Sequence, residues 1–490
     1  MNAALFDTKT YVTVSERSWE LSRRKTLRGV WDRMRKGVPA YRLFLKNAGT
    51  ASGRAPRISD PGGIGSMDKR NYFFRYPMEK QFYRDALNRD SYVATATSGS
   101  TGTPAYFFRT DEVDRRYAQI ASWFLSLGPK GSTLLIDCFG MGVWIGGLIT
   151  YQAFRYAGLS GFPVSIIAPG VNKKEIFEVL RRLAPQFRSV ILAGYPPFLK
   201  DILDGAKSEK VFFRPGQLRL VFAAEGFSEE FRNYMVEAGR LRSPYLDTMN
   251  IYGSAELGAM AFETPYTILV RRLAKTASEV LDRLFLPKRL PTLAQYDPRH
   301  IVFESLEGKI LITGDSAMPF FRYKIGDVGS TMTSSEIGDV FEEAGIKLNR
   351  KLSAAGIPKT HLPLVAVYER EDFSTKLYGA IVYPAHIRDA LSARALREAI
   401  TGKFAMRTGF DRWQNQFLEI LVELKPGKNP ARILKKRVTG EIVDGLLRQN
   451  AEYRNNYQSI PRKVTPRVTL LPHGDERYFR TGIKQKWVIK

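Results

Sequence analysis

The stretch that decides the fold is Thr97-Ser98-Gly99-Ser100-Thr101-Gly102-Thr103-Pro104, in which five of the eight residues carry a hydroxyl group. The flanking segments Tyr92-Val93-Ala94 and Tyr106-Phe107-Phe108 are rich in aromatic and apolar residues typical of strands. The stretch is therefore predicted to be a tight turn between two strands. Its two glycines lack the Cβ atoms that would hold a ligand away, so successive backbone N–H groups can point into one anion-binding concavity.

The composition of this turn suits a triphosphate whose charge is shared with a metal ion, because hydroxyl groups add donors without adding charge. A surface hairpin rich in Ser, Thr and Gly is the alternative, since short motifs recur by chance. The candidate phosphate-binding residues are Ser98, Gly99, Ser100, Thr101, Gly102 and Thr103.

Three further motifs follow along the chain: Asn250-Ile251-Tyr252-Gly253-Ser254-Ala255-Glu256, Arg322-Tyr323-Lys324-Ile325-Gly326-Asp327 and Gly482-Ile483-Lys484. In this order and at these distances, the four motifs resemble those of the adenylate-forming superfamily of acyl-CoA synthetases, luciferases and adenylation domains. The resemblance is nearer to the phenylacetate–CoA ligase-like branch, including relatives encoded with capsular polysaccharide genes. It extends over most of the chain, from about Val38 onward.

The resemblance implies roles for three side chains in the second and third motifs. Tyr252 would stack on adenine, because an aromatic face favours offset stacking. Glu256 would help to hold Mg²⁺, which prefers one or two carboxylates together with phosphate oxygens and water. Asp327 would accept hydrogen bonds from the ribose hydroxyl groups, as acidic residues do in dinucleotide-binding folds.

Each of these roles has a plainer alternative. Glu256 could be an acidic residue at a helix N-terminus, where the helix dipole favours it, and Asp327 could be a turn residue after glycine. The chain also departs from the family at Ala255, where relatives usually have a Thr or Ser that contacts the α-phosphate; Ser254 could compensate.

An apolar strand at 218–222 runs into a turn of small residues that resembles the family's adenine-binding turn. Ligands of open α/β sheets lie beyond the carboxyl ends of the strands, which is where this turn falls. The candidate adenine-binding residues of the turn are Ala224, Glu225 and Gly226. Ser228 should then cap the following helix.

The C-terminal motif supplies a candidate catalytic lysine. The family usually has Gly and Lys adjacent, whereas Ile483 separates Gly482 from Lys484 here, so Lys486 is the second choice. A flexible ammonium group can follow negative charge as it moves from carboxylate to acyl phosphate. A basic tail without a catalytic role is the alternative.

Alternation of short apolar strands with amphipathic helices between 132 and 198 predicts an α/β fold with a largely parallel sheet. Three strands near 301–304, 309–312 and 320–323 should form the family's small β-subdomain. The resemblance also implies a hinge at Arg370 and Asp372, followed by Gly379. We therefore expect an N-terminal adenylate-forming domain over 1–370 and a mobile α+β C-terminal lid domain over 371–490.

The segment Phe139 to Gly147 resembles the start of the helix that lines the acyl pocket in phenylacetate–CoA ligases. Phe139, Trp144 and Ile145 are large apolar side chains among four glycines and could line a slot for a flat group. A glycine-packed core helix is the alternative. Cys138, in the preceding apolar run, is expected to be a buried thiol.

Two basic amphipathic helices are also predicted. The first lies within residues 1–60 and could pack on the protein or lie on a membrane surface; its apolar positions are Trp19, Leu21, Leu27, Val30, Trp31 and Met34. The second, Ile268 to Arg289, resembles an insertion of the capsular relatives and has no assigned purpose.

The net charge of +26 over 490 residues is spread along the chain, without a long basic block or a nucleic-acid-binding motif. This pattern favours attraction of anionic substrates over nucleic-acid binding. The single cysteine excludes an internal disulfide and a thiolate-rich zinc site. No signal-peptide pattern is present and the most apolar window, 141–154, is too short to span a bilayer, so a cytoplasmic protein is expected.

The resemblance implies an acid–thiol ligase that uses ATP and Mg²⁺ to convert a carboxylic acid into an acyl-adenylate, with release of pyrophosphate. The branch favours an aryl or arylacetic acid, and the resemblance implies transfer to a thiol, with CoA as the favoured acceptor. Delivery to an amine or an acyl carrier protein is an alternative, and so is a catalytically silent, basic binding protein on the same fold.

Overall fold

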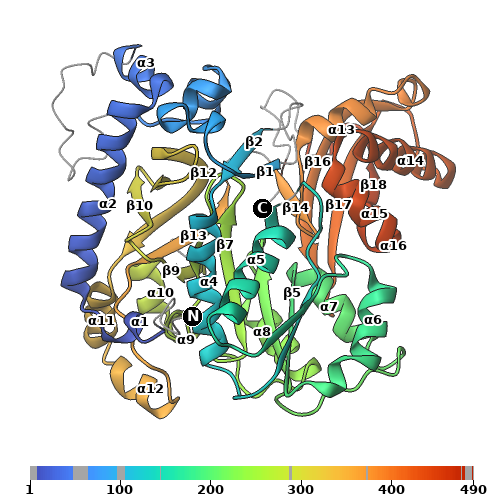
Figure 1. Cartoon of the computed structure of the whole chain (residues 1–490). Coiled ribbons are helices and arrows are strands. Elements are labelled where there is room, and N and C mark those ends of the chain that lie inside the picture. Colours follow the sequence, from blue (N-terminus) through green and yellow to red (C-terminus); the bar gives the residue numbers. More distant parts are fainter. Residues whose placement is uncertain are drawn as a thin grey trace.

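The computed structural model describes residues 8–47, 65–96, 105–143, 145–285, 290–370, 374–475, 477–479 and 488. Within these ranges, eleven strands form one mixed sheet with the order β10-β11-β12-β13-β9-β8-β7-β6-β5-β3-β4 (Figure 1). Smaller sheets pair β1 with β2, β14 with β15, and β16 and β18 with β17. The predicted α/β class is confirmed.

One half of the large sheet is parallel. Its five strands run side by side in the order β4-β3-β5-β6-β7. Strands β3 and β5 are buried along their whole length, which is typical of parallel strands that helices cover on both faces. These strands are β3 (Thr133–Asp137), β4 (Val164–Ile167), β5 (Ser189–Gly194), β6 (Leu218–Ala223) and β7 (Thr248–Ser254). The covering helices are α4 (Asp111–Ser126), α5 (Ile145–Leu159), α6 (Lys173–Arg182), α7 (Pro196–Gly205) and α8 (Glu229–Ala238).

The other half of the sheet is antiparallel. The three strands expected as a small β-subdomain are present, and the third of them, β12, continues into the main sheet because it pairs with both β11 and β13. The strands of this half are β8 (Gly258–Phe262), β9 (Thr292–Gln295), β10 (Ile301–Leu306), β11 (Lys309–Gly314), β12 (Phe320–Met332) and β13 (Leu364–Arg370).

The N-terminal region is helical, as predicted, and packs on the antiparallel half. Helix α2 (Glu16–Gly37) places Trp31 with its ring centroid 5.1 Å from that of Phe321 on β12. Its predicted apolar face is buried except at Leu21, which is 60% exposed. The helical region continues after Gly37, since α3 spans Pro39–Asn47; α1 (Thr10–Thr13) precedes α2, and single helical turns occupy Lys69–Phe73, Met78–Gln81 and Tyr83–Asn88.

The predicted helix from Ile268 to Arg289 is wrong in its bounds. The chain forms α9 (Pro265–Thr276) and α10 (Ser278–Leu284), separated at Ala277, whose φ of −120° and ψ of 94° are extended. Thr264 begins α9 with a capping box that Thr267 completes. The apolar side chains of both helices pack with those of α11 (Ser334–Glu343) and α12 (Leu348–Ala354).

After Arg370 no described strand joins the large sheet. The remaining elements lie together at the upper right of Figure 1. They are β14 (Thr375–Leu377), β15 (Ala380–Val382), α13 (Pro384–Leu391), β16 (Ile400–Phe410), β17 (Gln416–Leu424), α14 (Arg432–Gln449), α15 (Ala451–Ser459), α16 (Pro461–Val464) and β18 (Arg467–Leu471). The predicted boundary near 370 falls at the end of β13, and the division into two domains stays a prediction.

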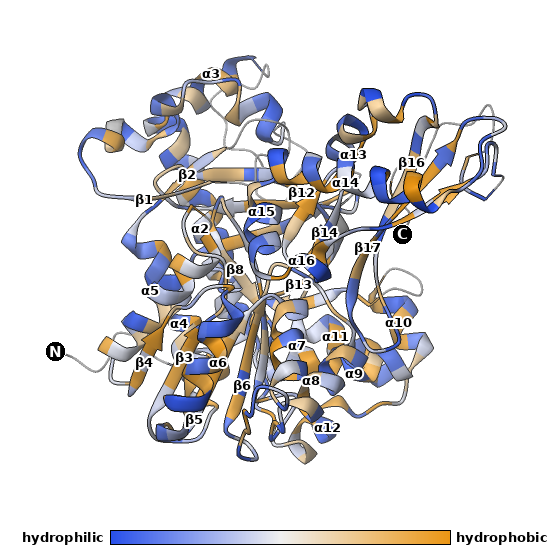
Figure 2. Cartoon of the chain, turned by 90° about the vertical axis from the view of Figure 1, so that its right-hand side faces the viewer, coloured by the Kyte–Doolittle hydropathy of each residue, from blue (hydrophilic) through white to orange (hydrophobic). Residues whose placement is uncertain are grey.

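Polar pairs join this C-terminal part to α7. The Nζ atom of Lys463 lies 2.9 Å from Oδ1 of Asp201, and Nζ of the buried Lys200 lies 3.0 Å from Oδ1 of Asn415. The main apolar core lies along the strands of the large sheet, which are largely orange in Figure 2, and it continues into the C-terminal part, where Tyr378 and Phe404 belong to the same buried cluster. Cys138 is fully buried in that core, as predicted. Among the described residues, no helix is long and apolar enough to cross a membrane.

Candidate active site

The two strands predicted on either side of the phosphate-binding turn are confirmed. They are β1 (Val93–Ala96) and β2 (Tyr106–Arg109), which pair antiparallel with Ala96 opposite Tyr106. The turn itself, with the candidates Ser98 to Thr103, lies outside the described residues. The N–H group of Ala96 donates to the carbonyl of Val143 at 2.9 Å, so this end of the hairpin lies against the segment that leads into α5.

Glu256 lies beside the same hairpin. It is in the turn between β7 and β8, where Ser254 pairs with Gly258, and not at a helix N-terminus as the alternative required. Its buried carboxylate lies 3.2 Å from Nζ of Lys69 and accepts a hydrogen bond from the Tyr323 hydroxyl at 3.3 Å. Lys69 in turn lies 6.0 Å from the ring centroid of Phe107 on β2, so the acidic candidate faces the strands that carry the phosphate candidates.

The hydroxyl of Ser254 does not face Glu256. It donates to the sulfur of Met260 at 3.5 Å, at the base of the β7–β8 hairpin. The Ser254 hydroxyl therefore does not take the place of the Thr or Ser hydroxyl that relatives have at the position of Ala255.

The candidates for adenine and ribose recognition meet. The Tyr252 hydroxyl on β7 donates to the Asp327 carboxylate on β12. Gly326, immediately before Asp327, has a φ of +96°, which a non-glycine residue adopts only with strain. Asp327 pairs through its backbone with Arg370, the last residue of β13, so the predicted hinge begins next to the predicted ribose ligand.

The predicted adenine turn follows β6, and Ala224 in it has a φ of +74°. The Glu225 carboxylate does not point toward Tyr252. It accepts hydrogen bonds from the Gly379 N–H group and from the Gln416 side chain, the latter at 2.7 Å. Burial raises the pKa of Glu225. This carboxylate therefore joins the turn to the C-terminal part, and Lys376 adds a hydrogen bond to the Ala224 carbonyl.

A second acidic contact lies beside the first. The Tyr195 hydroxyl donates to the Glu452 carboxylate at 3.2 Å, and burial raises the pKa of Glu452 from its ordinary value of 4.5 to about 7. Gly379 lies directly against Tyr195, since a Cβ atom on Gly379 would come within 2.6 Å of the ring. Sequence reasoning missed Tyr195 and Glu452; the position of Tyr195 just after the parallel strand β5 was the available signal.

The predicted acyl-pocket residues are partly accounted for. Phe139 is 1% exposed, and its ring packs edge-on against Tyr195 with centroids 5.3 Å apart. The glycines allow close packing, because a Cβ atom on Gly147 would lie 2.6 Å from the Met141 sulfur. These contacts favour the glycine-packed alternative for Phe139. Ile145 begins α5 and is partly buried, and Trp144 lies outside the described residues.

The carboxyl group of Asp137, at the end of β3, is a further buried acid beside this segment. One oxygen accepts the Phe139 N–H group at 3.1 Å, and burial raises its pKa well above the ordinary value. Its position as a charged residue at the carboxyl end of an apolar strand was the available signal.

The remaining candidates, Lys484, Lys486 and Asp372, lie outside the described residues. Val488, which follows the two lysines, forms a parallel bridge with Met406 on β16. Val488 is thus attached to the C-terminal sheet.

No family model and no curated protein matches the sequence. Solved structures do match. A 2-hydroxyisobutyryl-CoA ligase in complex with 2-HIB-AMP and CoA, in its thioesterification state, is 14% identical, with a TM-score of 0.62 over 98% of this chain and 91% of that one.

The same ligase has been solved in two other states. The open conformation, also with 2-HIB-AMP and CoA, gives a TM-score of 0.50 at 14% identity over 97% of this chain and 91% of that one. The postadenylation state with R3-HIB-AMP gives a TM-score of 0.53 at 14% identity, over 98% of this chain and 91% of that one. At this identity the likeness concerns the fold alone, and it shows that the chain has the α/β architecture of this ligase.

Proposed function

We propose that the protein is an ATP-dependent ligase that activates a carboxylic acid as an acyl-adenylate and transfers the acyl group to a thiol, CoA. The observation that supports this proposal is the hydrogen bond between Tyr252 and Asp327. The motifs assign both side chains to one nucleotide. Tyr252 is on β7 and Asp327 is on β12, far apart in the sequence, and they meet near Glu256 and the β1–β2 hairpin.

In the first half-reaction a carboxylate oxygen attacks the α-phosphorus of ATP, the bond to the bridging oxygen breaks, and pyrophosphate leaves. Such a step needs positioning and charge neutralisation more than covalent help from the protein. Ser98 to Thr103 would bind the phosphates, Tyr252 and Asp327 the nucleoside, and Lys484 would bridge the carboxylate and the α-phosphate.

Glu256 fits Mg²⁺ in this scheme. A single buried carboxylate is sufficient when phosphate oxygens supply other ligands, and the ion would neutralise charge on the leaving pyrophosphate. Lys69, whose side chain is 30% exposed, can turn from Glu256 toward a phosphate when the carboxylate is engaged.

The second half-reaction transfers the acyl carbon from the adenylate to a thiol sulfur and releases AMP and the thiol proton. The contacts of Gly379 and Gln416 with Glu225 support an arrangement for this step, because they bring a turn of the C-terminal part against the predicted adenine turn. The higher TM-score with the thioesterification state than with the open or postadenylation states of the ligase agrees with that assignment. The domains 1–370 and 371–490 would then rotate about Arg370 and Asp372 between half-reactions.

The motif resemblance supports an aryl or arylacetic acid as substrate. A carrier protein or an amine is the alternative acceptor. The alternative of another class is a catalytically silent binding protein, and the contact of Ser254 with Met260 favours it to the extent that Ala255 leaves no hydroxyl for the α-phosphate.

The test is carboxylate-dependent release of pyrophosphate from Mg·ATP over a panel of aryl, arylacetic and short hydroxy acids. We expect release with at least one acid and none without acid. Glu256→Gln should slow release about a hundredfold, the scale of one charge-stabilising group, whereas Glu279→Gln, at an exposed residue of α10, should not. No release with any acid, together with tight and salt-sensitive binding of duplex DNA, would leave the binding protein as the function.

A further inference from the structure

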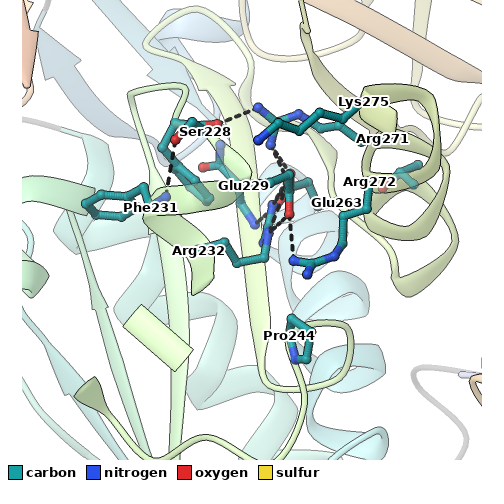
Figure 3. Close-up of polar contacts among 12 residues, drawn as sticks. Ser228, Glu229, Phe231, Arg232, Pro244, Glu263, Arg271, Arg272 and Lys275 are labelled. Carbon is teal, nitrogen blue, oxygen red and sulfur yellow. Dashed lines mark hydrogen bonds and ion pairs between the residues drawn. The ribbon is translucent and has the colours of Figure 1, made fainter. Parts of the chain in front are cut away.

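A cluster of five charged side chains lies under the predicted adenine turn. Arg232 and Glu229 come from α8, Arg271 and Arg272 from α9, and Glu263 follows β8 (Figure 3). We call these five residues the arginine–glutamate cluster. The side chains of Arg232, Glu229 and Glu263 are at most 3% exposed. Arg271 on α9 is 5% exposed, so the basic segment that had no predicted role directs part of its charge inward.

The members of the cluster contact one another closely. Arg232 lies 3.0 Å from Glu229 and 2.7 Å from Glu263, and it donates to the Thr248 hydroxyl at 2.7 Å. Arg271 lies 2.6 Å from Glu229, and Arg272 lies 3.1 Å from it. Burial alone would raise the pKa of Glu229, but Arg232 and Arg271 hold it below the ordinary value. The cluster therefore favours the ionised form of Glu229, and it contains three arginines and two glutamates.

The cluster is joined to the nucleotide site at two places. Arg271 donates to the carbonyl of Phe227, the residue after the turn, and the Arg232 guanidinium carbon lies 4.9 Å from the centroid of the Phe227 ring. Glu263 accepts the backbone N–H group of Asn250 at 3.1 Å, and the Asn250 side chain donates to the carbonyl of Glu225 at 3.2 Å.

These contacts connect the turn with β7 two residues before Tyr252. Stability alone does not account for such an arrangement, since replacing a buried ion cluster with apolar side chains is often neutral or stabilising. The turn, however, contains a strained residue: Ala224 has a φ of +74°, a conformation that persists only where its surroundings impose it.

We propose that the arginine–glutamate cluster holds the turn 224–226 and the Tyr252 end of β7 in the relative positions that ATP requires, and that Arg271 is a positioning residue for ATP. The inference rests on the proposed function, because it assigns the turn to the nucleotide. The inference adds Arg271 to the residues that determine ATP binding. Arg271 would act without touching the substrate, and it comes from the basic segment that had no predicted role.

The test compares Arg271→Met with Arg219→Met. Arg219 is equally buried and lies at the other end of β6, where it donates to the carbonyls of Phe124 at 2.7 Å and Leu246 at 2.9 Å and pairs with Asp247. Both changes remove a buried arginine next to a carboxylate and should lower the melting temperature. Only Arg271→Met should weaken Mg·ATP binding and raise KM for ATP, by about tenfold for the loss of a charge-assisted hydrogen bond to the turn, with KM for the acid little changed.

Arg271→Lys keeps the charge and one donor, so it should give a smaller rise of about threefold, and it provides the comparison if Arg271→Met does not fold. Unchanged Mg·ATP affinity in a folded Arg271 variant, or an equal loss in Arg219→Met, would overturn the inference. Titration of the wild-type protein with Mg·ATP distinguishes failure of this inference from failure of the proposed function. If the proposed function is wrong, the wild-type protein itself binds no ATP.

Discussion

Gly379→Ala is the change that most directly separates the two half-reactions. Gly379 lies in the turn between β14 and β15, has a φ of +84°, and donates its N–H group to the Glu225 carboxylate. A Cβ atom there would come within 2.6 to 2.9 Å of three atoms of the Tyr195 ring. That ring cannot move aside easily, because it packs on Phe139 and its hydroxyl is bound to Glu452.

Two penalties apply to this variant. An alanine in the left-handed region costs about 1–2 kcal/mol per residue, and forcing an extra methyl group into a packed site costs about 1–3 kcal/mol. The first penalty is present whether or not the turn is docked, so only the second opposes docking, by about 1–3 kcal/mol. This corresponds to roughly 5-fold to 150-fold in the population of the docked arrangement.

The assay is single-turnover transfer from preformed acyl-adenylate to CoA, measured beside pyrophosphate release. We expect transfer to slow by at least about fivefold, in line with the docking penalty, while pyrophosphate release changes little. The matched control is Gly402→Ala on β16. Gly402 has a φ of +83°, but a Cβ atom there would meet nothing within 4 Å, so this variant has the backbone strain without the clash.

Equal slowing of both half-reactions, or transfer at the wild-type rate, would refute the assignment of this turn to the transfer step. An equal loss in the Gly402 variant would attribute the effect to backbone strain in the C-terminal part.

Three further outcomes are expected. Asp327→Ala should weaken nucleotide binding by about 1.5–3 kcal/mol, the scale of a charge-assisted hydrogen bond, in a titration with Mg·ATP; wild-type affinity would remove the ribose assignment. Because the pKa of Glu452 in the folded chain is raised from 4.5 to about 7, the stability linked to its protonation is fully present below the ordinary value and lost as pH rises through about 7. The melting temperature should thus fall from about pH 5.5 to about pH 8.5 by more in the wild type than in Glu452→Gln, and parallel curves would contradict this. Lys484→Ala should slow adenylate formation roughly 10²–10³-fold with little effect on transfer from preformed adenylate; the same phenotype in Lys486→Ala instead would move the catalytic role by two residues.

Features set by local pattern were predictable from the sequence. Strands at 93–96 and 106–109 follow from apolar and aromatic residues on either side of a glycine-rich turn, and the cap at Ser228 follows from its position before Glu229. The meeting of Tyr252 with Asp327 was predictable only through the motif resemblance, because no periodicity relates two residues on strands so far apart.

Features set by tertiary contacts were not predictable from the sequence. The sequence presents 268–289 as one amphipathic segment, whereas the chain is extended at Ala277 and the two helices on either side both pack on α11 and α12. The pattern around Leu21 suits a buried face, yet the helix leaves that side chain in solvent. The orientation of Glu225 depends on Gly379 and Gln416, whose approach from the C-terminal part is invisible in the local sequence.

The polar contacts between α7 and the C-terminal part have a practical consequence for the choice of salt. Asp201 meets Lys463 and Lys200 meets Asn415 at this junction. The buried apolar cluster also continues across it, and the rings of Phe231 and Phe410 lie 6.3 Å apart, so separation would uncover both charge and apolar surface. Ionic screening shortens from about 10 Å at 0.1 M salt to about 3 Å at 1 M, so concentrated salt weakens the ion pair while leaving the apolar cores intact. Ammonium sulfate also strengthens apolar burial, because sulfate is excluded from the protein surface. A salt that only screens charge should therefore loosen this junction more than ammonium sulfate does.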